Sequence, residues 1–163
     1  MCEAIIESDM DFISDNAFYI EKSRQYTGLG KGIKSVEFIR IINDSLLFVE
    51  AKTSFPNLQN DSTDNRTRFN SQVVEICDKY VHSLNLYYSI YAGITDITFP
   101  DGFVPKDKVS IEFVLVIKNH KNEWCRRVKY AIEDALPKYL LKIWRPKIHV
   151  LNHENAQKKN LIS

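Results

Sequence analysis

Long apolar runs and paired cysteines are both missing from this sequence. No window approaches the ~18 consecutive apolar residues of a transmembrane helix, so we expect no membrane partner. Cys2, Cys77 and Cys125 are far apart and form no CxxC pattern, which predicts reduced thiols rather than disulfides. The opening residues, MCEAIIESDMDF, are acidic and lack the features of a targeting segment. We therefore expect a cytoplasmic protein.

Repeats, low-complexity tracts and linkers are also lacking, and glycine and proline number only 5 each. A chain of 163 residues with 44% hydrophobic and 26% charged residues has the size and composition of one globular domain. Such a chain buries roughly two-thirds of its unfolded surface without help from metals or disulfides. We therefore predict a single domain over residues 1–163, in which residues 54–70 form a polar loop.

Charge is balanced in total but unevenly distributed. Residues 1–103 contain 9 basic and 15 acidic side chains, whereas residues 104–163 contain 13 basic and 6 acidic ones. This asymmetry suits a protein whose acidic residues collect cations while a basic face meets phosphates. Ordinary solvated surfaces would explain it equally well.

Two apolar, β-branched runs form the clearest local signal. They cover residues 36–42 and 46–52 and are separated by the turn residues 43–45, a pattern that predicts a β-hairpin. Upstream, residues 18–23 are a candidate short strand, and the sequence TGLGKG at 27–32 is a glycine-bearing loop. Its lysine is not followed by Ser or Thr, so the phosphate-binding loop of nucleotide-binding proteins is not predicted.

A long helix and a buried strand are expected after the polar loop. Apolar residues recur at three- and four-residue spacing over 73–91, which predicts an amphipathic helix that ends near Gly93. Residues 109–117 are almost continuously apolar, as expected for a central strand covered on both faces.

The last third of the chain repeats this alternation. Asn122 is expected to cap a second helix that runs to about Leu136. A helical turn at 139–144, a strand at 147–151 and a terminal helix capped by Asn152 complete the order. The elements together predict an α/β sandwich, with a mixed central β-sheet flanked by helices.

Three charged residues of the predicted hairpin are candidates for chemistry. Glu50 and Lys52 project to the same face of their strand, and Glu37 lies on the partner strand. Two carboxylates can hold Mg²⁺ or Mn²⁺, which acts as a Lewis acid on a phosphodiester, while a nearby lysine orients water or neutralises the phosphate. This residue set predicts a metal-dependent phosphodiesterase.

An acid, a hairpin, ExK at a strand end, a long helix and a further strand together resemble the PD-(D/E)XK nuclease superfamily, over roughly residues 18–118. The resemblance implies a restriction-endonuclease-like fold with an αβββαβ core. It also implies that Glu37 and Glu50 bind metal, that the carbonyl of Ala51 is a further ligand, and that Lys52 is catalytic. The spacing of the acids is similar to that of archaeal Holliday-junction resolvases.

The chain departs from the family pattern at several positions. Glu37 replaces the usual Asp and follows Ser-Val rather than Pro-Asp. An additional glutamate from the N-terminal part is frequent in the family, and Glu21, Glu7 and Glu3 are candidates for it. Gln72, on the helix after ExK, is a candidate to support the metal ligands.

The same charged residues also have a purely structural explanation. Lys52 would pair with one of the glutamates in a cross-strand salt bridge worth under ~1 kcal/mol. The apolar neighbours of the charges argue against a bare surface hairpin. His120, Cys125 and His153 offer an alternative zinc site, but their spacing matches no compact ligand motif, so packing or capping is predicted.

Basic residues outside the hairpin are candidates to bind nucleic acid. Lys31 and Lys34 lie in or next to the glycine-bearing loop, and Arg126 and Arg127 follow Trp124 at a predicted helix start. Such residues can contact phosphates. A solvated helix face and a flexible turn are the alternatives.

Three functions remain open from the sequence. The first is a metal-dependent nuclease that hydrolyses DNA or RNA, with DNA favoured as the partner. The second is a catalytically inactive PD-(D/E)XK-like domain that binds nucleic acid or a protein. The third is an interaction protein with no nucleic-acid role. A homodimer is a further expectation, since small nucleases commonly dimerise to address two strands.

Overall fold

A five-stranded mixed sheet forms the centre of the protein in a computed structural model that describes residues 4–163. The strand order is β3-β4-β5-β6-β7. These strands are β3 (Ala17–Phe18), β4 (Phe38–Ile42), β5 (Ser45–Lys52), β6 (Ser110–Ile117) and β7 (Lys147–Asn152). Strand β4 runs antiparallel to β3 and to β5, and β5, β6 and β7 run parallel to one another. The chain is therefore an α/β protein, as the sequence predicts.

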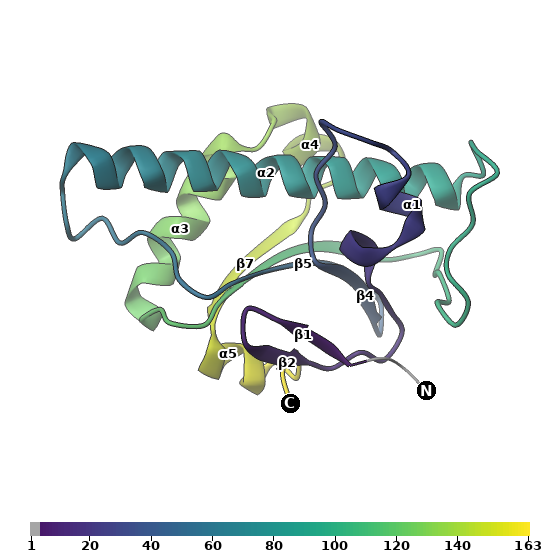
Figure 1. Ribbon diagram of the computed structural model, residues 1–163, viewed down its shortest axis with the longest axis horizontal. Helices are drawn as coiled ribbons and strands as arrows, with labels where there is room; N and C mark the ends of the chain where they lie inside the picture. Colours follow the sequence, from purple (N-terminus) through teal and green to yellow (C-terminus); the bar gives the residue numbers. More distant parts are fainter. Residues whose placement is uncertain (1–3) are drawn as a thin grey trace.

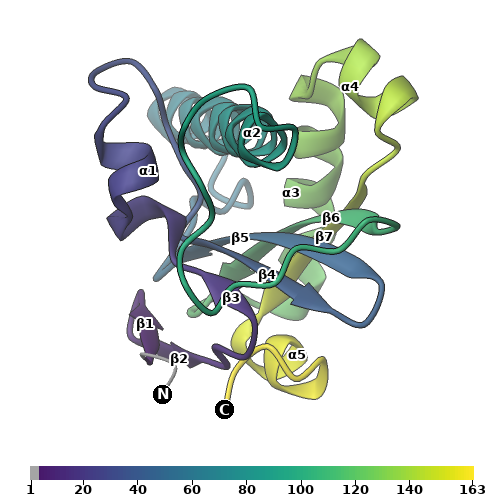
Figure 2. The ribbon, with the colours of Figure 1, turned by 90° about the vertical axis from the view of Figure 1, so that its right-hand side faces the viewer.

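Helices lie on both sides of this sheet (Figure 1). The long helix α2 crosses above the strands, with α3 and α4 beside it, while α5 lies below (Figures 1 and 2). Their bounds are η1 Ile20–Lys22, α1 Arg24–Thr27, α2 Thr63–Tyr91, α3 Asn122–Ala135, α4 Lys138–Ile143 and α5 His153–Lys158. Between β5 and β6, and again between β6 and β7, a helical segment provides the crossover that parallel strands require.

Strand alternation divides the buried residues into two apolar clusters. Leu46 and Phe48 of β5 pack with α2 and α3 on the upper face of the sheet. Leu47 and Val49 point the other way and pack with the N-terminal segment and α5. Because β5 is covered on both faces, six consecutive residues of this strand are buried.

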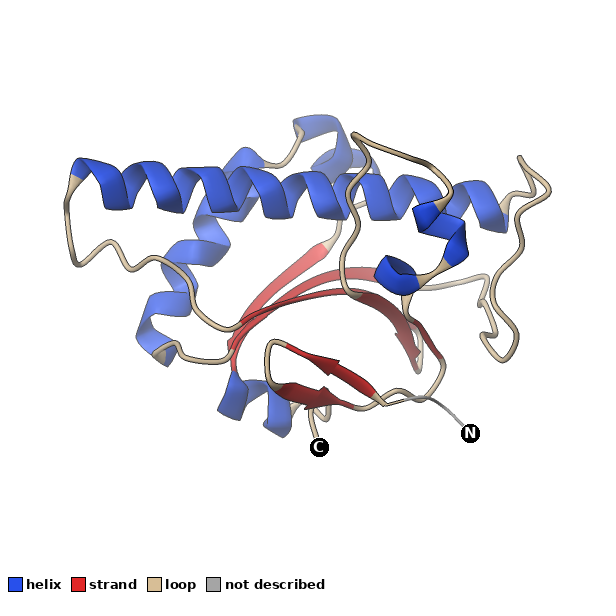
Figure 3. Ribbon diagram, viewed as in Figure 1, coloured by secondary structure: helices blue, strands red, loops and turns tan. Residues whose placement is uncertain are grey.

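A second, two-stranded sheet lies below the main one and was not predicted from the sequence (Figure 3). It consists of β1 (Ile5–Glu7) and β2 (Met10–Phe12). Ser8 and Asp9 form its turn with φ of 51° and 58°, a conformation that non-glycine residues adopt mainly in tight turns. Strands of three residues are too short to give a clear period-2 pattern.

Two predicted segments are wrong in extent. Helix α2 begins at Thr63 rather than near residue 73, so it includes half of the segment predicted as loop. Its first turn has few apolar residues, and the start is set by Ser62, whose hydroxyl accepts a hydrogen bond from the Asn65 N–H. The strand predicted over 18–23 is shorter: β3 ends at Phe18, and a 3₁₀ turn follows.

The C-terminal predictions are close to the structure. Helix α3 begins at Asn122, although Lys121 rather than Asn122 is the capping position. The Asn152 side chain caps α5 through the Asn155 N–H, as predicted. Within residues 4–163 no helix combines the length and apolarity needed to cross a membrane.

Candidate metal centre

The hairpin of β4 and β5 brings two glutamates close together. The strands pair Phe38 with Val49, so Glu37, the residue before β4, and Glu50 of β5 both adjoin the last pair of the hairpin. Phe38 and Val49 both belong to the lower cluster. Because side chains alternate along a strand, Glu50 projects upwards, towards α2, and its charge acts on Glu37.

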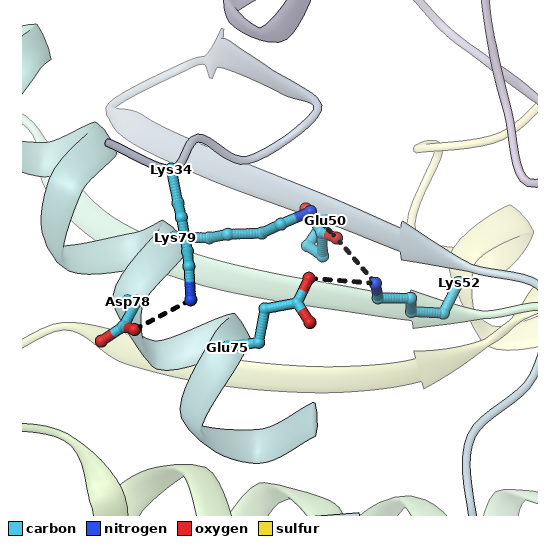
Figure 4. Close-up of polar contacts among 6 residues, drawn as sticks. All are labelled: Lys34, Glu50, Lys52, Glu75, Asp78 and Lys79. Carbon is cyan, nitrogen blue, oxygen red and sulfur yellow. Dashed lines mark hydrogen bonds and ion pairs between the residues drawn. The ribbon is translucent and has the colours of Figure 1, made fainter. Parts of the chain in front are cut away.

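Glu50 is completely buried and contacts two lysines. One carboxylate oxygen, Oε1, lies 2.7 Å from Lys79 Nζ and 3.5 Å from Lys52 Nζ. Figure 4 shows Lys79 reaching Glu50 from α2 and Lys52 reaching it from the same strand. The other oxygen, Oε2, is buried without a hydrogen-bond partner in the described chain. One edge of the Glu50 carboxylate is thus neutralised by lysines, and the other is buried without a partner among the described residues.

Burial and charge act in opposite directions on this pair. Burial raises the pKa of Glu50, although Lys79 and Lys52 partly offset the effect. Burial lowers the pKa of Lys79, but the charge of Glu50, the hydrogen bond with Glu50 and the charges of Glu37 and Glu21 together outweigh it, and the net shift is upward. Lys79 therefore remains an ammonium group at neutral pH. Lys52 also approaches Glu75 of α2, at 4.0 Å.

A group of three carboxylates lies next to Glu50. Glu7 at the end of β1, Glu21 in η1 and Glu37 each contribute an oxygen within 4.8 Å of the other two. The Glu21 N–H donates a hydrogen bond to the Glu37 carbonyl at 3.3 Å, which ties the 3₁₀ turn to the strand end. We call Glu7, Glu21, Glu37 and Glu50 the acidic group.

Glu37 has a strongly perturbed environment. Its side chain is buried, and its Oε2 has no hydrogen-bond partner among the described residues. Burial, a hydrogen bond with Glu21 and the charges of Glu50, Glu21 and Glu7 raise the pKa of Glu37 to about 9. At neutral pH Glu37 therefore holds a proton that offsets the crowded negative charge. A divalent cation could take the place of this proton.

The remaining predicted metal-site residues lie at or beside this group. Ala51 is between Glu50 and Lys52, with its side chain buried on the opposite face. Gln72 is partly exposed on α2, one turn before Glu75. Of the candidates for an additional glutamate, Glu21 and Glu7 join Glu37, whereas Glu3 lies outside the described residues.

The predicted nucleic-acid-binding residues divide into two regions. Lys31 is exposed in the loop before β4, and Lys34 forms an ion pair with Asp78 of α2 at 3.1 Å (Figure 4). Arg126 donates a hydrogen bond to the Tyr130 hydroxyl on α3. Arg127 lies at the start of α3 beside a cavity. The structure therefore does not gather these four residues into one surface.

The alternative zinc site does not form. Cys125 belongs to the upper cluster, whereas His153 begins α5, which packs on the lower face. Within residues 4–163, the group of Glu7, Glu21 and Glu37 is the set of His, Cys, Asp and Glu side chains that approaches metal-ligand spacing. Cys77 and Cys125 are buried free thiols, as expected, and Cys2 lies outside the described residues.

Glu75, which approaches Lys52 from α2, was not identified from the sequence. Glu7 was a candidate from the sequence, and it reaches the acidic group from the unpredicted β1–β2 hairpin. Helical spacing of Glu75, Lys79 and Gln72 was an available signal, since these residues share one face of α2.

No family model matches the chain, and the comparisons with curated proteins and with solved structures find no similar protein.

Proposed function

We propose that this protein is a metal-dependent nuclease with a restriction-endonuclease-like fold. The observation that carries the proposal is the proximity of Glu37, just before β4, to Glu50 of β5, with Lys52 on the same face of β5 as Glu50. An antiparallel hairpin followed by a long helix and a parallel strand supports the proposed fold.

The acidic group fits a hard divalent cation. Mg²⁺ and Mn²⁺ prefer oxygen ligands. Glu37 and Glu50 each have a buried carboxylate oxygen without a partner among the described residues, and the charge of Glu50 acts on Glu37. Glu21 and Glu7 supply further oxygens. When bound, the metal would supply Lewis-acid stabilisation of the charge that develops on the phosphate.

The protein's own residues would position the reactants. Lys79 holds one edge of the Glu50 carboxylate and so fixes its orientation. Lys52 is partly exposed, unlike Glu50, so its ammonium can meet a phosphate or a water molecule at the mouth of the site. Lys52 is therefore the residue we assign to catalysis, and Lys79 is a positioning residue.

Cleavage assays on single-stranded, duplex and branched DNA and RNA with Mg²⁺ or Mn²⁺ test this proposal. Wild-type protein should cleave at least one of these substrates, and Lys52→Ala should remove turnover while the fold is retained. Lys108→Ala is a matched control, because Lys108 is an exposed lysine in the loop before β6. Cleavage that persists in Lys52→Ala would exclude the assigned catalytic role.

A specific contact favours a second candidate, an inactive relative of this fold that binds nucleic acid or protein. Lys79 already neutralises Glu50 at 2.7 Å, as a bound cation would in an active site. Under this alternative the acidic group binds no metal, and Mn²⁺ leaves the melting temperature unchanged. Cleavage and metal binding therefore separate the two candidates.

A further inference from the structure

A small cavity lies at the end of the sheet where the parallel strands β5 and β6 terminate. It has a volume of about 190 Å³, and it is bordered by the loop after β5, by the first turns of α3 and by Phe69 of α2. Leu58, Phe69 and Val128 supply apolar walls, and His120, Trp124 and Arg127 supply polar groups. Ligands of α/β proteins commonly bind at the carboxyl ends of parallel strands.

The backbone connects this cavity directly to the acidic group. Strand β5 ends at Lys52, whose carbonyl accepts a hydrogen bond from the Lys118 N–H at 2.9 Å. The Thr53 carbonyl accepts another from the Asn119 N–H at 2.9 Å, and His120 follows. The segments that follow β5 and β6 are therefore hydrogen-bonded to each other beside Lys52, and each continues to a wall of the cavity.

Two residues that line the cavity carry buried nitrogen atoms without hydrogen-bond partners of ordinary geometry. His120 is only 9% exposed, and its ring meets no such partner among the described residues, although the Trp124 backbone lies near enough to raise its pKa against the effect of burial. Nε1 of Trp124, whose ring lies 5.2 Å from that of His120, also has no partner among the described residues. Buried polar groups are costly to leave unpaired, so these adjacent groups need a polar partner.

The chemistry of the wall indicates what that partner is. Burial lowers the pKa of His120, so the imidazole is neutral at pH 7 and offers one donor and one acceptor. Trp124 adds a donor, and Glu123 at the exposed rim disfavours a bare anion. The cavity is smaller than the ~300 Å³ at which drug-sized pockets begin. A flat heterocycle with donors and acceptors on its edge matches these properties.

We propose that this cavity binds one unpaired base of a nucleic-acid strand, with Arg127 at the rim contacting the adjoining phosphate. The proposal rests on the proposed function for the identity of the ligand as nucleic acid. Stacking on aromatic side chains and hydrogen bonds to a base edge are how single bases are held in proteins. A base in a duplex cannot enter, so the cavity favours single-stranded or distorted substrates.

Fluorescence of Trp124 gives a direct test that needs no cleavage. The chain has 2 tryptophans, and Trp144 packs against Tyr88 at the C-terminal end of α4, so Trp144→Phe leaves Trp124 as the reporter. A short single-stranded oligonucleotide, added in EDTA, should quench this fluorescence saturably. The same strand carrying abasic sugars should bind about tenfold more weakly, since stacking of a base on an aromatic side chain contributes affinity of this order.

A matched pair of histidine variants refines the test. In the Trp144→Phe background, His120→Ala should lower affinity for the base-containing strand about tenfold, whereas His153→Ala on the lower face should not. Equal binding of base-containing and abasic strands, or no quenching at all, would overturn the proposal, and a water-filled cavity would give this result. The comparison of the two strands uses an intact cavity, so it holds even if His120→Ala fails to fold.

The outcomes also separate the cavity from the nuclease proposal. If Lys52-dependent cleavage occurs while abasic and base-containing strands bind equally, the nuclease stands and the base-binding cavity is wrong. If no substrate is cleaved but binding requires the base and His120, the cavity stands and the nuclease proposal is wrong.

Discussion

At the scale of single residues, the Glu50 and Lys79 pair is the contact on which the site's geometry depends. Both side chains are almost entirely removed from solvent, at 0% and 12% exposure. Loss of one member of a buried pair typically costs about 3–5 kcal/mol, because the other charge stays buried without its partner. Lys79→Met should therefore lower the free energy of unfolding by about 3 kcal/mol, the low end of this range, since Lys52 remains near Glu50. Urea denaturation measures this change.

Lys34, in the loop before β4, provides the matched control, because its partner Asp78 lies on the same helix as Lys79. Its pair with Asp78 spans 3.1 Å, but both side chains are more than 40% exposed. Exposed pairs contribute under about 1 kcal/mol, so Lys34→Met should be nearly neutral. If Lys79→Met and Lys34→Met lower the free energy of unfolding equally, the buried contact between Glu50 and Lys79 contributes no more to stability than the exposed pair.

Glu37 gives the metal-free protein a defined pH dependence. The pKa of Glu37 rises from 4.5 to about 9 on folding, so between these values the folded state holds a proton that the unfolded state has lost. Stability falls with rising pH wherever the folded state binds more protons. The contribution of Glu37 should therefore be complete below pH 4.5 and decline up to about pH 9.

Glu37→Gln isolates this effect, because glutamine resembles the protonated side chain at every pH. Melting curves in EDTA should show that wild type loses stability relative to Glu37→Gln as pH rises through this window. A constant difference between the two proteins across the window would contradict the protonated state of Glu37.

At the scale of elements, the start of α2 is open to a simple test. The Ser62 hydroxyl accepts the Asn65 N–H at 3.1 Å, and the loss of such a cap costs about 1 kcal/mol. Ser62→Ala should destabilise the protein by this amount, as measured by denaturant unfolding. Ser71→Ala, at an exposed position within α2, should have no such cost because alanine favours helix interiors.

Sequence patterns predicted the helices and strands whose buried side chains recur with regular spacing along the chain. The hairpin of β4 and β5, the strand β6 and most of α2 follow from apolar periodicity, and the α/β class follows from their order. Elements whose stability depends on distant contacts were missed. The β1–β2 hairpin is one, because its residues Ile5 and Phe12 are buried only against the underside of the sheet.

The candidate site shows the same division. The proximity of Glu37 to Glu50 could be predicted because a hairpin fixes the register of its two strands, and both residues adjoin the pair Phe38 and Val49. The choice among N-terminal glutamates could not, since Glu7 and Glu21 reach Glu37 through the tertiary placement of β1 and η1. Local spacing contains no information about such contacts.

At the scale of the whole molecule, the basic C-terminal part predicts salt-sensitive nucleic-acid binding. Phosphate contacts release counterions, so affinity should fall steeply as salt rises. Arg126→Ala combined with Arg127→Ala should weaken binding to all sequences similarly and reduce the salt slope. Binding isotherms at several salt concentrations measure both effects. Absence of binding at low salt would favour an interaction protein with no nucleic-acid role.

The central claim is that the acidic group binds a divalent cation. A ligand that binds only the folded state stabilises it by RT ln(1 + [L]/Kd), about 1.4 kcal/mol at tenfold excess over Kd. Glu37→Gln is the informative variant, because it removes a proposed metal ligand and keeps the ion pair between Lys79 and Glu50. Glu50→Gln would instead leave Lys79 without that partner.

Melting temperature as a function of Mn²⁺ concentration, in wild type and in Glu37→Gln, is the most direct measurement. We expect millimolar Mn²⁺ to raise the melting temperature of wild type by several degrees. Glu37→Gln should be at least as stable as wild type without metal and nearly indifferent to Mn²⁺. A wild-type melting curve that millimolar Mn²⁺ does not move would contradict the metal site.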